Sequence, residues 1–213
     1  MSPSKIHINR VINLIPTIGI LGFALLYFYS TTLYPGGSQA NLNSEGFDWI
    51  NNYWCNLMNE KGMNGKHNSA RPFSIFAMIL LCLSFMVFSI QFAETFAKNS
   101  FWNLIIKVGG ILSMFFAILI STRFHDLMTL LSSFFGLFLV VGIIKEVRQS
   151  ELTNYKITGI ICLIFLAVNN LVYYLNQFIE WLPLLQKITF LIVLLWVLGL
   201  NYEIRKKIKS DFN

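Results

Sequence analysis

The residues best suited to chemistry stand side by side at His125 and Asp126. A histidine next to a carboxylate can move protons as a general acid and base. With His67 as a third group, this pair would suit a hydrolase or transferase that acts on lipids. The alternative is structural: residues 123–126 form a turn, and Asp126 caps the helix that follows and opposes its dipole.

The spacing of the possible ligands gives little support to a metal centre. A catalytic zinc site takes three protein ligands of the His, Cys or carboxylate type and keeps one position open. The groups available for it are His67, His125, Cys55, Asp48 and Asp126. No two of them form a His-x-x-x-His pair or a similar motif. We therefore predict no metal and no cofactor.

The elements that must position these residues follow from composition. The chain has 213 residues, 55% of them apolar and only 12% charged, with a mean hydropathy of +0.61. Soluble domains carry about twice that charged fraction, and 20 Phe, 8 Tyr and 5 Trp exclude a disordered chain. A membrane-spanning helix needs about 20 mostly apolar residues. We predict an all-α polytopic transmembrane bundle, a single domain over 1–213, with six spans at 11–29, 72–92, 104–122, 127–144, 157–174 and 184–200.

Basic residues predict the orientation, because Lys and Arg are retained on the cytoplasmic side. With the N-terminus inside, the cytoplasmic segments hold eleven of the 16: Lys5, Arg10, Lys98, Lys107, Lys145, Arg148, Lys156, Arg205, Lys206, Lys207 and Lys209. The outer side holds five: Lys61, Lys66, Arg71, Arg123 and Lys187. Six spans place both termini in the cytoplasm and one long loop, 30–71, outside. We expect a multi-pass protein of the bacterial inner membrane; if 11–29 were a cleaved signal peptide, five spans would keep the same orientation.

The net charge of +6 does not predict a nucleic-acid partner. The basic residues stand at the ends of the predicted helices, where they face anionic lipid headgroups and set the topology. We expect membrane lipid as the partner, and no nucleic acid.

Uncharged polar residues gather on the outer side of the predicted membrane. An unpaired amide in hydrocarbon costs several kcal/mol, so Asn169 and Asn170 should face protein or a water-filled recess. Arg71 and Arg123 would suit an anionic headgroup, because a guanidinium can bind phosphate through two hydrogen bonds. The predicted ligand-binding residues are Asn52, Asn56, Arg71, Arg123, Asn169, Asn170 and Tyr173. We expect them to surround an outward-facing pocket that binds a lipid or a similar amphiphile.

Aromatic residues in the outer loop allow two interpretations. They can form the interfacial belt of an ordinary membrane protein. Alternatively, residues 48–57 form an amphipathic helical turn, with Trp49, Tyr53 and Leu57 on one face, that covers an opening between helices and admits an apolar ligand.

Small residues predict how two spans pack. Close approach of helices in lipid relies on Gly, Ala, Ser and Thr. These residues recur at spacings of three and four in the third and fourth spans: Gly109, Ser113, Ala117 and Ser121, then Thr129, Ser132, Ser133 and Gly136. We predict that the two sets face each other. In a third functional hypothesis, the protein is a non-enzymatic assembly partner whose small-residue faces pack against another membrane protein or against a second copy of the chain.

Motifs in the outer loop resemble one known family. They are Tyr34-Pro35-Gly36-Gly37-Ser38, Gly46-Phe47, Asn52-Tyr53-Trp54-Cys55-Asn56-Leu57 and Asn64-Gly65, followed by a span. This pattern resembles the bacterial integral membrane family called domain of unknown function 998. The resemblance implies a six-helix layout and an outer loop of interest, and it implies no established activity. The family pattern favours an acidic residue where this chain has Asn56; were that acid catalytic, its absence here would argue against an enzymatic role for the chain.

Overall fold

The computed structural model describes residues 12–150 and 152–210. Within these ranges, six helices are long and apolar enough to cross a bilayer, which confirms the all-α fold with six spans. They are α2 (Ile15–Thr32), α3 (Arg71–Phe96), α4 (Ser100–Ile118), α5 (His125–Arg148), α6 (Thr153–Leu175) and α7 (Leu182–Ser210). Short 3-10 turns are η1 (Trp54–Met58), η2 (Leu119–Ser121) and η3 (Ile179–Trp181). The protein is therefore an integral membrane protein.

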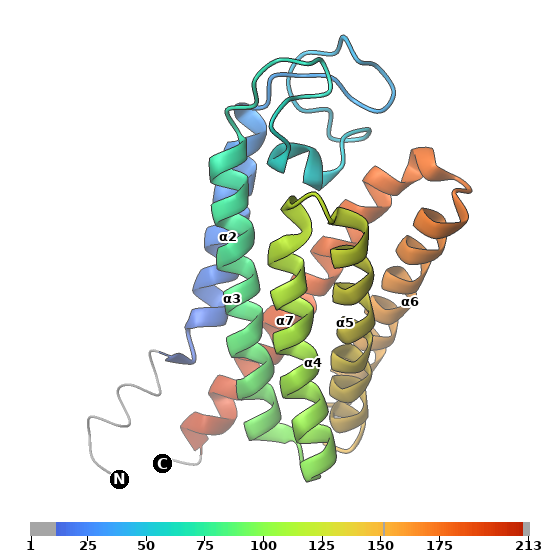
Figure 1. Ribbon diagram of the computed structural model, residues 1–213. Helices are drawn as coiled ribbons and strands as arrows, with labels where there is room; N and C mark the ends of the chain where they lie inside the picture. The colour runs from blue at the N-terminus through green and yellow to red at the C-terminus, as the bar shows by residue number, and fades with distance from the viewer. Residues whose placement is uncertain (1–11, 151, 211–213) are drawn as a thin grey trace.

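Successive helices run antiparallel and pack as neighbours, and α7 returns to contact α3 and α2 (Figure 1). The start of α2 and the end of α7 lie at the same end of the bundle, and residues 33–70 fold over the opposite end (Figure 1). We call residues 33–70 the outer loop. This arrangement agrees with the even number of spans predicted from the basic residues.

The predicted seam between the third and fourth spans is present between α4 and α5. The Ser113 hydroxyl donates a hydrogen bond to the Ser132 carbonyl oxygen at 2.8 Å. A Cβ on Gly109 would lie 3.1 Å from the carbonyl oxygen of Phe135, so the glycine permits close contact of the two backbones. At the end of the bundle opposite the outer loop, Lys107 of α4 and Glu94 of α3 form an ion pair at 3.3 Å.

Large apolar side chains fill the interior of the helical bundle. Phe88, Phe92, Ile143, Leu200 and Ile204 are all essentially inaccessible to solvent. Large apolar side chains also cover the outside of the bundle, as a lipid environment requires.

Several helix boundaries differ from the predicted spans, because polar residues continue a helix beyond its apolar run. The clearest case is α7, which continues through the basic run 205–207 to Ser210. Pro16, expected inside the first span, stands in the first turn of α2, where its missing N–H costs nothing. The amphipathic helix expected at 48–57 is not formed: the chain makes a turn and then the short η1.

Candidate functional site

Buried asparagines hold the outer loop together. The Asn52 amide donates to the Gly37 carbonyl oxygen at 2.8 Å and accepts from the Asp48 N–H at 2.8 Å. The Asn56 side-chain oxygen accepts from the Tyr53 N–H at 2.6 Å. Both side chains are almost inaccessible. The structure thus places these two predicted ligand-binding residues inside the loop, where their amides satisfy backbone groups.

The turn η1 is fastened to the helices below it. The Tyr27 hydroxyl of α2 donates to the Trp54 carbonyl oxygen at 3.1 Å. The Trp54 N–H donates to the Gln186 side-chain oxygen of α7 at 3.1 Å. Ser74 of α3 donates to the Leu57 carbonyl oxygen at 2.8 Å. The outer loop is therefore a fixed cover over α2, α3 and α7.

Lys187 completes this attachment from α7. Its ammonium group donates to the carbonyl oxygens of Asn52 and Pro183. It also lies 5.7 Å from the centre of the Phe47 ring and 5.8 Å from the Trp54 ring, within cation–π range. Among the described residues, no carboxylate lies within ion-pair distance of this charge.

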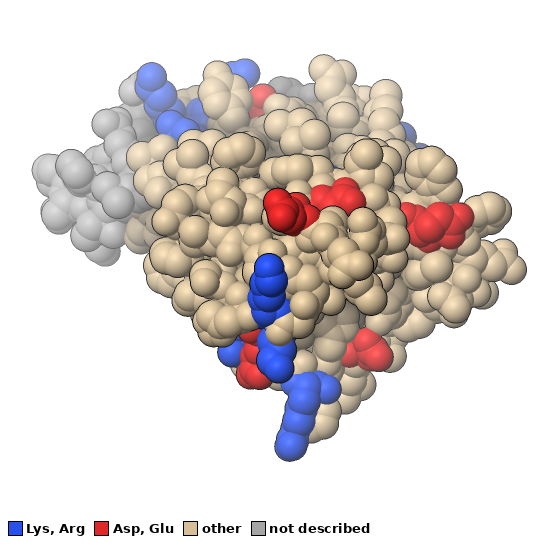
Figure 2. Space-filling view, turned by 90° about the horizontal axis from the view of Figure 1, so that it is seen from above, with Lys and Arg blue, Asp and Glu red and all other residues tan. Residues whose placement is uncertain are grey.

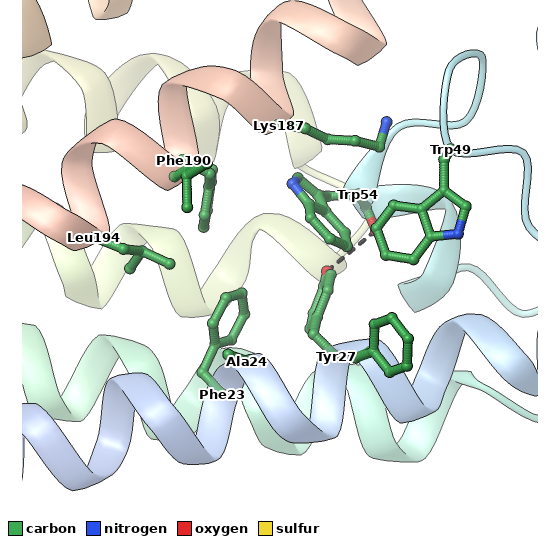
Figure 3. A pocket seen from close by; sticks show the side chains of 10 residues that line it. Phe23, Ala24, Tyr27, Trp49, Trp54, Lys187, Phe190 and Leu194 are labelled. Atoms are coloured by element: carbon green, nitrogen blue, oxygen red, sulfur yellow. Dashed lines mark hydrogen bonds between the residues drawn. The ribbon is translucent and has the colours of Figure 1, made fainter.

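An apolar cavity of about 150 Å³ lies between α2 and α7 beneath the outer loop (Figure 3). We call it the α2–α7 groove. It is lined by Phe23, Ala24, Tyr27, Phe28, Trp49, Trp54, Lys187, Phe190, Leu191 and Leu194. Phe28 and Leu191, at its edges, are 63% and 58% exposed, so the groove opens on the surface that faces lipid. It is smaller than a typical small-molecule site of about 300–1,000 Å³.

None of the predicted site residues lines the α2–α7 groove. Arg71 pairs with Glu60 at 3.3 Å, and with Lys61 and His67 these two residues surround a separate cavity of about 260 Å³. That cavity belongs to the loop surface, where the charged side chains are scattered (Figure 2).

His125, Asp126 and Tyr173 do come together, at the outer ends of α5 and α6. One carboxylate oxygen of Asp126 accepts from the Tyr173 hydroxyl at 2.6 Å and lies 3.0 Å from Nδ1 of His125. Asp126 does not cap α5, as the structural interpretation expected, but it lies in the first turn of α5, where its charge opposes the helix dipole as that interpretation also expected. Its carboxylate also connects α5 to α6. The Arg123 guanidinium lies 4.9 Å from the ring of Phe124.

The two asparagines of α6 are engaged by protein groups. Asn169 donates to the Phe165 carbonyl oxygen at 3.0 Å and to the Thr189 hydroxyl of α7. Asn170 donates to the Leu166 carbonyl oxygen at 2.8 Å. Asn169 therefore contacts α7, whereas the Asn170 amide bonds only to the backbone of its own helix. The predicted set is thus divided among the loop interior, the loop surface and the α5–α6–α7 side of the bundle.

Sequence reasoning missed Lys187 and the groove walls on α2 and α7. Lys187 was counted only as one of five outer basic residues. The available signal was a lysine in the second turn of a span, next to Gln186 and facing an aromatic-rich loop.

The titratable groups of the outer loop are not set up for nucleophilic chemistry. Burial raises the pKa of the Cys55 thiol to about 11, so the thiol stays protonated and unreactive near neutral pH. Burial raises the pKa of Asp48, but hydrogen bonds from Asn51 and Ile50 outweigh it and hold the pKa below its usual value. Among the described residues, no three His, Cys, Asp or Glu side chains gather as a metal site requires.

Comparison of the chain with protein-family models, with curated proteins and with solved structures finds no match.

Proposed function

We propose that this membrane protein binds an anionic single-chain amphiphile, with its hydrocarbon chain in the α2–α7 groove. The observation that carries the proposal is an apolar cavity that opens toward lipid and has a lysine above it. We also propose that the outer loop faces away from the cytoplasm, as the basic residues predict, and that the chain belongs with domain of unknown function 998.

The position of the groove supports a lipid chain as its occupant. Its walls come from α2 and α7, which leave Phe28 and Leu191 exposed on the membrane side. A chain can therefore enter sideways from the bilayer without crossing the outer loop.

The positive charge of Lys187 above the groove supports the proposal that the ligand has a negative headgroup. The Lys187 ammonium group contacts carbonyl oxygens and aromatic rings, and the Asp48 carboxylate acts on it from beyond ion-pair distance. A nearby anion is favoured there, because the surroundings screen less than bulk water.

Native mass spectrometry with added 16:0 lysophosphatidylglycerol or palmitic acid tests the proposal. Ala24→Trp fills the groove from α2, and Ala167→Trp makes the same change on the exposed face of α6. We expect bound amphiphile on the wild type and on Ala167→Trp, and at least a tenfold loss on Ala24→Trp.

Equal binding to both tryptophan variants would overturn the proposal. If Arg71→Ala or Arg123→Ala lost binding and Ala24→Trp did not, the headgroup would bind at the arginines predicted from the sequence and not at the groove. Circular dichroism and a melting temperature for each variant check that it is folded.

A further inference from the structure

The wall of the α2–α7 groove contains one unsatisfied hydrogen-bond donor. The indole Nε1–H of Trp54 is buried and has no hydrogen-bond partner among the described residues. Trp54 lines the groove, and Figure 3 shows its nitrogen at the end of the ring that is turned toward Phe190, away from Trp49. Because this nitrogen has essentially no accessible surface, an acceptor in the groove reaches it only when the indole ring turns, and pairing then recovers the free energy that an unpaired buried donor costs.

The other polar groups around the groove add positive charge and no competing anion. The Tyr27 hydroxyl already donates to the Trp54 carbonyl oxygen. Lys187 uses two of its three N–H groups on carbonyl oxygens, which leaves one N–H for a ligand. Among the described residues, no Asp or Glu lines the groove. The complementary ligand group is therefore an anion that only accepts hydrogen bonds.

Contacts to the polar end group of the ligand must make binding in the groove more favourable than remaining in the bilayer. A hydrocarbon chain gains little by leaving lipid for the groove, because lipid tails are as apolar as the groove walls. The occupant is then selected by the group at the end of its chain.

The size of the groove decides which anion fits. About 150 Å³ is enough for a small ring such as benzene, and the outer loop closes the groove from above. A carboxylate is compact and flat, whereas a phosphodiester headgroup also has to place its glycerol beneath the loop. A single chain that ends in a carboxylate meets all of these constraints.

We infer that the groove binds a free fatty acid, whose carboxylate accepts the Trp54 indole N–H beside the charge of Lys187. This inference rests on the proposed function and names its ligand class. The hydrogen bond from Trp54 orients the carboxylate, and the charge of Lys187 favours the ionised acid over neutral amphiphiles with the same chain.

Competition against a diazirine-labelled palmitic acid, with the protein in phosphatidylcholine nanodiscs, tests the inference. The competitors share one chain length: palmitate, hexadecanol, methyl palmitate and 16:0 lysophosphatidylglycerol. We expect palmitate to compete at about tenfold lower concentration than the two neutral molecules, as one hydrogen bond to a charged group predicts.

Variants then separate the two recognition elements. Trp54→Phe removes the N–H and keeps an aromatic ring, and Lys187→Met removes the charge and keeps the stem. Each should reduce the preference for palmitate over hexadecanol about threefold, so that the two elements together account for the tenfold preference of the wild type. Trp181→Phe and Lys66→Met make the same changes at exposed outer positions and should leave the preference intact.

The outcomes distinguish the inference from the proposed function. Equal competition by all four molecules, with labelling still blocked by Ala24→Trp, would overturn the fatty-acid assignment and leave chain binding in place. Stronger competition by lysophosphatidylglycerol than by palmitate would assign the site to a phospholipid instead. Labelling that Ala24→Trp does not reduce would overturn both. The wild-type competition series decides the matter even if Lys187→Met loosens the loop.

Discussion

The ammonium group of Lys187 in α7 donates a hydrogen bond to the backbone carbonyl oxygen of Asn52, 135 residues earlier in the chain. The last helix is thereby joined directly to the outer loop. The same lysine places a positive charge above the α2–α7 groove, so the attachment of the loop and the proposed binding of an anion depend on one side chain.

The buried Asn52 amide should be essential to the loop. Asn52→Ala leaves the Gly37 carbonyl and the Asp48 N–H without their partner, and we expect a loss of about 2 kcal/mol in the free energy of unfolding. Asn43→Ala, at an exposed loop position, should change it by less than about 0.5 kcal/mol. Limited proteolysis and thermal melting measure both; equal stability of the two variants would refute the structural role of Asn52.

Cys55 should react slowly with maleimides in the folded protein. Its pKa of about 11, against an ordinary value of 9.0, leaves about hundredfold less thiolate at pH 8. The labelling rate should therefore rise about tenfold per pH unit from 8 to 10, and in denatured protein it should level off near pH 9. Mass spectrometry of the Cys55 peptide follows the rate. A plateau near pH 9 in folded protein would show that the thiol is not buried as described.

Close contact between α2 and α3 requires a glycine at position 19. A Cβ there would lie 2.6 Å from the Cβ of Ser84, so Gly19→Ala should lower the free energy of unfolding by about 1–3 kcal/mol. Adding Ser84→Gly should recover part of the loss, because it removes the atoms in conflict. Thermal melting tests this pair. Additive losses in the double variant would mean that the two positions do not meet.

Tyr173 and Asp126 should act together. Tyr173→Phe and Asp126→Asn each remove the same hydrogen bond between α6 and α5, so their effects on melting temperature should be non-additive. His125→Ala should melt close to the wild type, because its side chain is partly exposed. The hydrolase hypothesis makes the same prediction for stability and adds that His125→Ala abolishes turnover of a lipid substrate.

Two serine-to-cysteine changes test the orientation. Ser69 is exposed in the outer loop, and Ser210 is exposed at the end of α7. In intact cells, a membrane-impermeant maleimide should label Ser69→Cys and spare Ser210→Cys until the membrane is opened. The reverse pattern would invert the topology predicted from Lys and Arg.

The elements were predictable because their signals are local. A span is a continuous apolar run, and the small residues that join α4 to α5 recur at helical spacing, so both can be found without knowing the fold. The ends of the helices were predicted less accurately. Nothing in the apolar run of α7 marks the helical turns through 205–207 that follow it.

The groove was not predictable in the same way. Its walls come from α2, α7 and the outer loop, and its aromatic residues look like an ordinary interfacial belt when taken singly. Asn52 and Asn56 were expected to bind a ligand because they are polar, yet backbone groups of the loop occupy their amides. Only the folded loop distinguishes an amide that is free to bind from one that is already paired.

The position of covalent adducts from a diazirine-labelled palmitic acid is the most direct test of the α2–α7 groove. After photolysis in phosphatidylcholine nanodiscs, peptide mass spectrometry locates the modified residues. We predict adducts concentrated on Phe28, Leu191 and Leu194, which line the groove. Adducts spread along the exposed face of α6, where Ile157 is 64% and Leu171 57% exposed, at the same frequency as on α2 and α7 would contradict the account.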